Sequence, residues 1–180
     1  MPTSAPTNVL VFGIRSLWAV EDAGPCRINA RRTAMTNIPI KRLRANAVFP
    51  AYATANSAGA DLYACLDEPV DIGPHETRMI PLGYSMAIPE GWAGLIFARS
   101  GLASKRHLAP ANKVGVVDAD YRGEWWVPLH NHSDAPQSVQ PGERIAQLVI
   151  VPCMTAAFCE VDNLDETERG TGGFGSTGTN

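Results

Sequence analysis

The sequence predicts an all-β protein, a sandwich or a barrel, built as a single domain. Three observations lead to this class: short apolar runs, turn signals between them, and little helical periodicity. The runs are rich in Val, Ile, Tyr and Trp, whose side chains fit the pleated surface of a strand. They are TRMIPLGYSMAIP (77–89), GWAGLIFA (91–98), KVGVV (113–117), EWWVPLHNH (124–132) and RIAQLVIVP (144–152).

Residues that interrupt strands separate these runs. DIGP precedes the run at 77–89, IPEG separates it from 91–98, and QPGE precedes 144–152. Pro cannot donate to a strand ladder and Gly adopts conformations that end one, so these tetrapeptides indicate turns. GLASKRH (101–107) is the one plausible helical turn, and it is too short to change the predicted class.

By composition the chain divides into three parts. Residues 1–36 mix Pro, Thr, Ala and Arg without periodicity, which is typical of a poorly structured extension or of an upstream start assigned in place of Met35. The acidic pair at 21–22 disfavours a transit peptide. We expect the β domain to span 37–161 and residues 162–180 to form a mobile C-terminal arm.

Charge and apolar patterning exclude two classes of partner. The formal net charge of −3 argues against binding to a nucleic-acid polymer, which needs clustered Lys and Arg. No run approaches the roughly 18 apolar residues of a membrane span. The four cysteines form no C-x-x-C pair, which favours free thiols in a reducing compartment, and no basic region of a signal peptide precedes the apolar stretch at 8–20. The predicted location is therefore cytoplasmic.

A polar segment follows the apolar run at 91–98. Arg99, Ser100 and Gly101 offer a guanidinium, a hydroxyl and exposed backbone amides, a combination that suits a phosphate chain. Taken alone, such a segment is more often a surface turn with a stray arginine.

GVVDADYRGEWW (115–126) has the pattern of a β-hairpin whose turn carries two carboxylates and an aromatic ring. One of Asp118 and Asp120 is a candidate general base, with Tyr121 placed to pack on a ring. Aspartates in turns are usually only turn formers. Alternation puts both carboxylates on the same side, so spacing does not choose between them.

Two polar side chains lie inside apolar stretches. Asp61, in SAGADLYA, and Gln147, in PGERIAQLVIV, need partners because an unpaired carboxylate or amide is costly to bury. For Asp61 the candidates are a cation, a water network or backbone amides. For both residues a structural hydrogen bond is the more frequent explanation.

The tail RGTGGFGSTGTN (169–180) is similar in sequence to two phosphate-binding motifs but lacks features that each motif requires. It satisfies G-x-G-x-x-G without the following helix, and it lacks the lysine of a Walker A loop. The physical capability remains: successive backbone N–H groups, the hydroxyls of Ser176 and Thr177, the charge of Arg169 and the flat face of Phe174 suit a base and a phosphate.

In this order, five segments resemble the trimeric dUTP diphosphatase (dUTPase) family: AGADLYA, ARSGLASK, GVVDADYRGEW, PGERIAQLVI and RGTGGFGSTG. The resemblance runs from about Ala47 to Gly178. It implies a distorted jelly-roll β-barrel that assembles as a homotrimer, with active sites at subunit boundaries and a Gly-rich lid over each. It also implies the reaction dUTP + H2O → dUMP + diphosphate, which limits uracil in DNA and supplies dUMP for thymidylate synthesis.

The resemblance assigns roles to the hairpin and to residues near it. Asp118 would be the base that activates water for in-line attack on the α-phosphorus. Asn112 and the backbone at Val116 and Val117 would read the uracil edge. Tyr121 would lie against the deoxyribose and exclude a 2′-hydroxyl.

The phosphates, and Mg²⁺ with them, would be bound by the remaining segments. The resemblance implies Mg²⁺ held by the phosphates and by waters that Asp61 touches, as fits an ion that keeps several waters. It also implies that Phe174 covers the uracil. The remaining substrate-binding residues implied are Arg99, Ser100, Gly101, Gln147, Arg169, Gly175, Ser176 and Thr177.

One departure and two alternatives accompany this interpretation. Many relatives carry a β-branched residue and a lysine where this chain has Trp125 and Trp126, so we expect the return strand to pack differently or to bury more area in the trimer. A dCTP deaminase-like enzyme would need a further glutamate-based proton-transfer site and would lack the tail motif. A non-catalytic nucleotide-binding protein of the same fold is disfavoured by the intact Asp118, Tyr121 and tail.

Overall fold

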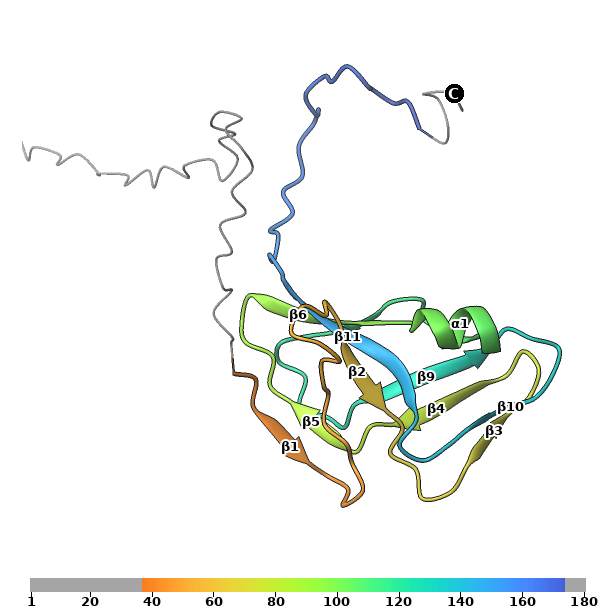
Figure 1. The fold of residues 1–180 in the computed structure, drawn as a ribbon. Helices are drawn as coiled ribbons and strands as arrows, with labels where there is room; N and C mark the ends of the chain where they lie inside the picture. The colour runs from red at the N-terminus through yellow and green to blue at the C-terminus, as the bar shows by residue number, and fades with distance from the viewer. Residues whose placement is uncertain (1–36, 174–180) are drawn as a thin grey trace, which may run out of the picture. The chain divides into compact units, whose positions relative to one another are not determined.

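The computed structural model describes residues 37–173 (Figure 1). Within that range the chain forms eleven β-strands and one short helix, so the predicted all-β class is confirmed. Residues 1–36, interpreted from the sequence as an extension, and residues 174–180 lie outside the described range.

Most strands are three to six residues long, as expected where turn signals recur every few residues. The long apolar run at 77–89 splits into two strands at Gly83, which has a φ of 77° and where a Cβ would lie 2.5 Å from the sulfur of Cys65. The strands are β1 (Ile40–Arg42), β2 (Ala60–Tyr63), β3 (Val70–Ile72), β4 (Thr77–Pro81), β5 (Tyr84–Met86), β6 (Trp92–Phe97), β7 (Leu108–Pro110), β8 (Gly115–Val117), β9 (Trp126–Asn131), β10 (Gln137–Val139) and β11 (Arg144–Pro152).

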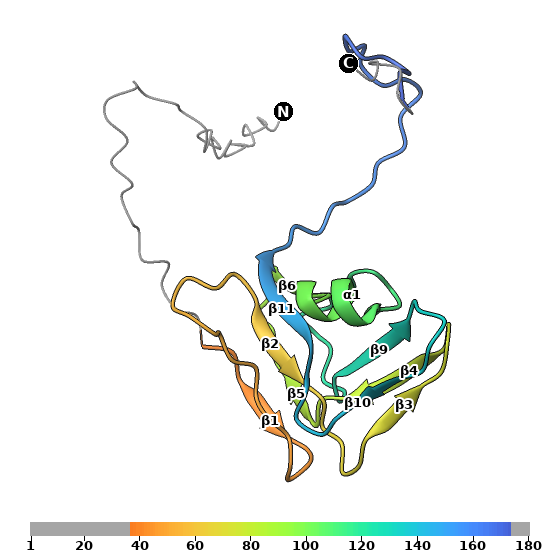
Figure 2. The ribbon, with the colours of Figure 1, turned by 45° about the vertical axis from the view of Figure 1, so that its right-hand side comes forward.

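These strands pair antiparallel in four small sheets, whose arrangement Figures 1 and 2 show from two sides. The largest has the order β2-β11-β6-β8 and the second the order β4-β9-β7, while β1-β5 and β10-β3 form two further pairs. The nine-residue β11 pairs with β2 on one edge and with β6 on the other. It therefore joins segments from the beginning, middle and end of the domain.

One hydrophobic core joins the inner faces of the sheets. On β9 the fully buried residues are Val127, Leu129 and Asn131, and the residues between them are more exposed. On β2 the same alternation buries Leu62 and leaves Asp61 partly exposed. Burying a Leu side chain contributes about 2 kcal/mol, so the apolar residues decide which face of each strand turns inward. Asp61 is thereby directed to the outer face.

The single helix of the described range, α1 (Ser100–Arg106), follows β6 and confirms the helical turn expected at 101–107. It begins after Arg99, buries Leu102, and ends at His107 in the left-handed conformation. Between residues 37 and 173, no helix is long and apolar enough to cross a membrane.

The β-hairpin predicted at 115–126 is not formed. β8 pairs with β6, whereas β9 pairs with β4 and β7, so the two strands belong to different sheets. The physical reason is Trp125, which is 2% exposed and packs in the core beside Tyr84, while Trp126 faces outward. To bury this indole the chain passes from one sheet to the other through residues 118–125, the crossing loop.

Candidate functional site

A polar pocket of about 330 Å³ opens on the outer face of the β2-β11-β6 sheet. It brings together residues from β2, from the start of α1 and from β11. Five of the residues expected to bind the phosphates or the waters of Mg²⁺ line this pocket. They are Asp61, Arg99, Ser100, Gly101 and Gln147. The lining residues are Ala53, Ser57, Ala58, Gly59, Asp61, Arg99, Ser100, Gly101, Arg144 and Gln147.

Strand register explains why three of these polar side chains meet. Asp61 lies opposite Gln147, and Gln147 lies opposite Phe97 on the other neighbouring strand. Residues opposite each other in antiparallel strands point to the same face. Arg99 is two residues beyond Phe97, so alternation returns its side chain to this face. The sheet therefore presents a carboxylate, an amide and a guanidinium side by side.

A β-bulge brings Arg144 to the same pocket. A regular strand would place Arg144 and Gln147, three residues apart, on opposite faces. The pairing of β11 with β2 shifts register between Arg144 and Ala146, and both Ile145 and Ala146 are fully buried. The extra residue changes the phase of the strand, as bulges do. Sequence reasoning missed Arg144 because its spacing from Gln147 carries no sign of the bulge.

Asp61 is held between the two arginines. Its Oδ1 accepts a 2.7 Å hydrogen bond from Arg99 Nε, and its Oδ2 accepts one of 3.1 Å from Arg144 Nη1. The Asp61 side chain is only 13% exposed, so these charge-assisted bonds are less screened than at a free surface. Arg99 also donates from Nη1 to the Arg144 carbonyl at 3.2 Å. Because a guanidinium has five donors, both arginines retain N–H groups for a second anion.

Gln147 is fixed at the centre of the polar pocket. Its Nε2 donates to the carbonyl of Ala98 at 2.8 Å. On the other side of the amide, a Cβ at Gly59 would stand 2.7 Å from Gln147 Oε1, so only glycine allows this approach. Both polar side chains inside apolar stretches, Asp61 and Gln147, thus have structural hydrogen-bond partners.

A second cavity of about 290 Å³, the loop pocket, lies beside the crossing loop. Its lining is mainly apolar, with two carboxylates and one phenol. A cavity of this kind suits a planar ring that carries polar edges. The lining residues are Met79, Ile96, Val116, Val117, Asp118, Tyr121, Glu124, Trp125 and Trp126.

The sequence spacing does not show whether Asp118 or Asp120 is the candidate base, but the structure distinguishes the two. Asp118 lines the loop pocket together with Val116, Val117 and Tyr121, whereas Asp120 does not line that cavity. Asp120 lines a neighbouring hollow, which Asp118 lines as well. Asp118 directly follows β8, whose pairing with β6 fixes the backbone before it. Asp118 is therefore the better placed candidate base.

Tyr121 folds back on the crossing loop. Its hydroxyl donates to the Glu124 carbonyl at 2.9 Å, and its amide donates to the Asp118 carbonyl at 3.2 Å. Gly123 is needed beside the ring, because a Cβ there would lie 2.4 Å from the Tyr121 hydroxyl oxygen. Tyr121 is 45% exposed, so part of its surface remains open to a ligand.

Several predicted residues lie outside both pockets. Asn112 is exposed, and its amide packs over Gly115 of β8 rather than lining the loop pocket. Arg169 is exposed in the arm, where its Nε donates to the Gly172 carbonyl at 2.8 Å. The remaining tail residues, Phe174, Gly175, Ser176 and Thr177, lie outside the described residues.

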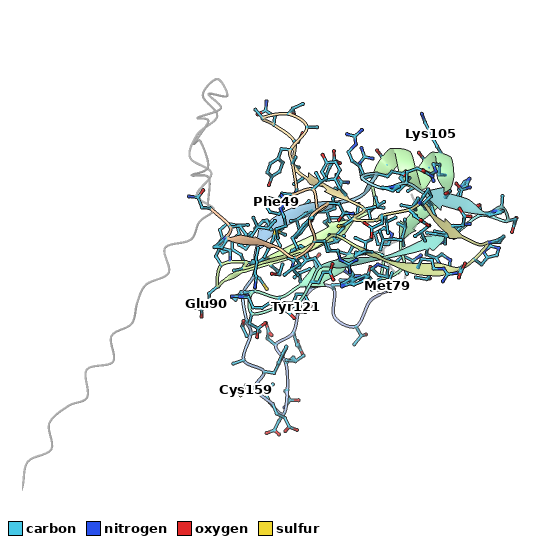
Figure 3. All side chains as sticks on the ribbon, turned by 90° about the horizontal axis from the view of Figure 1, so that it is seen from below. Phe49, Met79, Glu90, Lys105, Tyr121 and Cys159 are labelled. Atoms are coloured by element: carbon cyan, nitrogen blue, oxygen red, sulfur yellow. The ribbon has the colours of Figure 1, made fainter. Side chains whose placement is uncertain are left out.

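The two pockets lie at opposite ends of β6. Strand register places the last residue of β8 beside Gly94, near the start of β6, while Arg99 follows the end of the strand. Five residues of extended chain separate these positions by about 16 Å. In Figure 3, Tyr121 and Lys105 of α1 lie at different sides of the domain. Asp118 and Arg99 of one chain therefore do not meet in one cavity.

The polar pocket suits a hydrated cation better than a directly bound one. Among residues 37–173, no group of three or more His, Cys, Asp or Glu side chains is placed to hold a metal ion. Both oxygens of Asp61 already accept a hydrogen bond from an arginine. Each carboxylate oxygen can accept a second bond, so Asp61 can still hold waters of a cation that arrives with a ligand.

Comparison with known protein sequences gives one consistent family. Residues 45–178 match the family model dUTPase. A deoxyuridine 5'-triphosphate nucleotidohydrolase of Maricaulis maris is 53% identical over 133 residues, which cover 73% of this chain and 88% of that protein. A protein of the same name from Syntrophotalea carbinolica is 47% identical over 141 residues, which cover 78% and 96%.

Solved structures agree with this result. A dUTPase of Staphylococcus bacteriophage 80alpha with dUPNHPP has a TM-score of 0.74 at 31% identity, covering 81% of this chain and 100% of that one. A dUTPase of phage phi11 of S. aureus, described with a structural Mg(II) ion, has a TM-score of 0.67 at 27% identity, covering 73% and 100%. The likeness confirms the expected jelly-roll barrel.

Proposed function

The chain belongs to the dUTPase family, and on that premise we propose that it hydrolyses dUTP to dUMP and diphosphate. The observation that carries the proposal is the polar pocket, where two guanidiniums flank one carboxylate on a single face of the sheet. Hydrolysis of dUTP keeps uracil out of DNA and supplies dUMP for thymidylate synthesis.

The polar pocket is the proposed site of the triphosphate. Arg99 and Arg144 bring two positive charges against the one negative charge of Asp61, so the pocket attracts a polyanion. Ser100 and Gly101 add a hydroxyl and backbone N–H groups at the start of α1. Gln147 assists from the centre of the pocket. Together these donors would orient the α-phosphorus for attack.

Asp118 is the proposed general base. Its carboxylate takes a proton from water while the water oxygen forms a bond to the α-phosphorus. The bond from that phosphorus to the bridging oxygen breaks in line, and diphosphate leaves with the electron pair. General-base assistance of this kind typically contributes about 10²–10⁴-fold in rate.

The loop pocket is the proposed site of the deoxyuridine. Its apolar lining takes the ring, and the backbone of Val116 and Val117, with Asn112, reads the uracil edge. A close fit excludes the methyl group of thymine, and a polar mismatch rejects the amino group of cytosine. The Tyr121 ring lies against the deoxyribose where a 2′-hydroxyl would clash, so UTP is rejected.

Mg²⁺ is the proposed cofactor. When bound, it supplies positive charge that neutralises the phosphate oxygens. Asp61 would hold its water shell through the lone pairs that the arginines leave open, and the phosphates would supply the direct ligands. Asp61 orients both arginines and would also hold the hydrated cation.

A homotrimer is proposed because the two pockets of one chain are too far apart to act on the same α-phosphorus. A second copy would supply Asp118 to the polar pocket of the first. The segment that follows β11 supports assembly: Met154, Phe158 and Leu164 are 89%, 98% and 84% exposed in the single chain. Apolar side chains left this open are typical of a surface that a partner covers.

The end of the arm is the proposed lid. Arg169 and the hydroxyls of Ser176 and Thr177 would approach the phosphates, with Gly175 allowing close backbone contact. Phe174 would cover the uracil. Closure of such a segment excludes water other than the attacking molecule and completes the site.

Incubation with dUTP, dCTP and dTTP, each with Mg²⁺, tests the proposed function. We expect diphosphate release from dUTP alone. Ammonia release from dCTP would indicate a deaminase instead. Nucleotide binding without turnover would indicate a non-catalytic protein, and either of these two results would overturn the proposal.

A further inference from the structure

The crossing loop contacts the N-terminal part of the domain through one arginine. Arg44 Nε donates to Glu124 Oε1 at 2.7 Å, and Arg44 Nη2 donates to Glu124 Oε2 at 3.0 Å. The same guanidinium lies over Trp126, with its central carbon 5.3 Å from the ring centroid. The two partners of the ion pair are 80 residues apart, so the contact depends on the tertiary fold.

The backbone fixes Arg44 beside the end of the crossing loop. The amides of Leu43 and Arg44 donate to the Gly83 carbonyl at 2.8 and 3.0 Å. One residue earlier, the Leu82 amide donates to the Trp125 carbonyl at 2.9 Å. Arg44 and the loop therefore share the same turn between β4 and β5, and the guanidinium starts from a well-defined position.

Glu124 connects this ion pair to Tyr121. The Glu124 carboxylate is bound by Arg44, while its carbonyl accepts the Tyr121 hydroxyl at 2.9 Å. Because β8 and β9 belong to different sheets, no strand ladder sets the shape of the loop between them. Its shape depends on contacts of this kind, and Arg44 makes one from outside the loop.

We propose that Arg44 is a positioning residue for Tyr121: by holding Glu124 and lying over Trp126, it fixes the ring that separates dUTP from UTP. The inference rests on the proposed function, in which Tyr121 lies against the deoxyribose. Two parallel charged hydrogen bonds make this pair stronger than an ordinary surface ion pair. The hydrogen bond that Arg44 donates to the Glu124 carboxylate also raises the pKa of Arg44, in keeping with a stable contact.

The consequence concerns selectivity more than turnover. The Glu124 carbonyl is also held by its own peptide group, because the Trp125 amide donates to the Tyr84 carbonyl at 2.9 Å. Arg44 instead holds the Glu124 carboxylate and lies over the Trp126 ring, and both residues line the loop pocket beside Tyr121. Without Arg44 these side chains move more freely, and the Tyr121 ring yields to a 2′-hydroxyl. Asp118 is fixed independently, because it directly follows β8 and its pairing with β6. Loss of Arg44 should therefore raise activity on UTP relative to dUTP rather than abolish hydrolysis.

The test compares kcat/KM for dUTP and UTP in Arg44→Ala, Glu124→Gln and the double variant. We expect the dUTP-to-UTP ratio to fall about three- to tenfold in each single variant. The double variant should fall no further, because both changes remove the same contact. Arg44→Lys keeps the charge without the planar fork and should be intermediate.

A matched control is Arg78→Ala, which removes the exposed Arg78–Glu76 ion pair of 2.8 Å outside the crossing loop. Its selectivity should equal that of the wild type. As a readout besides turnover, the ratio of Kd values for dUPNHPP and its ribose counterpart should fall in the Arg44 variants as the kinetic ratio does.

Two outcomes overturn the inference, and a third concerns the proposed function alone. A dUTP-to-UTP ratio in Arg44→Ala within about twofold of the wild type shows that Arg44 does not position Tyr121. A parallel fall for both substrates, together with a lower Tm, shows a structural role only. If the wild type turns over no dUTP, the proposed function fails, and the Kd ratio still decides whether Arg44 sets selectivity for the sugar.

Discussion

Arg99 Nε donates a 2.7 Å hydrogen bond to Asp61 Oδ1, joining the end of β6 to β2 across β11. Arg144 binds the second oxygen of the same carboxylate at 3.1 Å. Three chain segments thus meet at one charged group that is mostly shielded from solvent. The proposed phosphate site is therefore assembled within a single chain before any substrate arrives.

Replacement of Asp61 should damage this assembly. In Asp61→Asn an amide N–H₂ group faces one guanidinium, so donor meets donor and an arginine loses its orientation. We expect kcat/KM for dUTP to fall about 10–100-fold, because small misplacements of binding groups are costly. Steady-state kinetics measure the loss. Asp134→Asn, which alters an exposed acid paired with His75, is the control and should retain full activity.

Replacement of Asp118 should separate binding from chemistry. Asp118→Asn keeps the shape of the side chain but cannot take a proton from water. We expect dUTP to bind with nearly wild-type affinity while kcat falls at least about 100-fold. Calorimetric titration with dUPNHPP and steady-state kinetics measure the two quantities. A variant with wild-type kcat would show that another group is the base, and Asp120→Asn would then be the next variant to compare.

Mixing two inactive variants should restore activity if sites are shared between chains. Arg99→Ala spoils the polar pocket, and Asp118→Asn removes the base. In mixed trimers with random assortment, about one site in four combines an intact pocket from one chain with an intact base from another. Activity should therefore rise after the two proteins are unfolded together and refolded. Activity that stays at the level of the separate variants would show that each site is built by one chain.

Much of the fold and the site was predictable because its signals are local. Turn tetrapeptides placed the strand ends, and Arg99, Ser100 and Gly101 follow a strand in a pattern that suits phosphate. Choosing between Asp118 and Asp120 needed the family resemblance, because alternation places both on one side. The structure adds a geometric reason, since Asp118 lines the loop pocket and Asp120 does not.

What the sequence could not show depends on long-range packing. The bulge that turns Arg144 toward Gln147 is a register shift between two strands, and no residue spacing reveals it. The hairpin prediction failed because Trp125 is more favourably buried in the core than kept on a return strand. The contact of Arg44 with Glu124 spans 80 residues and is visible only in the folded domain.

Gly59 should be essential to the polar pocket but not to folding. A Cβ at this position would stand 2.7 Å from Gln147 Oε1, the far end of a flexible side chain. In Gly59→Ala we expect Gln147 to turn away, lose its bond to the Ala98 carbonyl and raise KM for dUTP, with Tm within about 2 °C of the wild type. Gly91→Ala is not a matched control, because the φ of 79° at Gly91 would strain any residue with a Cβ. Gly101→Ala would meet no atom within 4 Å, but Gly101 lines the polar pocket itself. Gly73→Ala is the suitable comparison, because Gly73 lines neither pocket and a Cβ there would meet only the flexible Glu76 side chain, at 3.2 Å.

Tyr84 offers a test of the core that is independent of the site. Its side chain is fully buried, and among the described residues its hydroxyl has no hydrogen-bond partner. Burial accordingly raises the pKa of the phenol, because the charged form is disfavoured inside the core. An unpaired buried hydroxyl costs about 1–3 kcal/mol, so its removal should be favourable.

Tyr84→Phe keeps the ring and its packing against Phe49 and Trp125 while removing that hydroxyl. We expect the free energy of unfolding to rise by about 1 kcal/mol, which corresponds to an increase in Tm of about 2–4 °C for a domain of this size. Tyr52→Phe, at a side chain that is 55% exposed, should leave Tm unchanged. A lower Tm in Tyr84→Phe would mean that the hydroxyl is satisfied in the assembled protein. The hydrogen-bond partner of the hydroxyl would then be a group of another copy of the chain, a buried water or a residue outside 37–173.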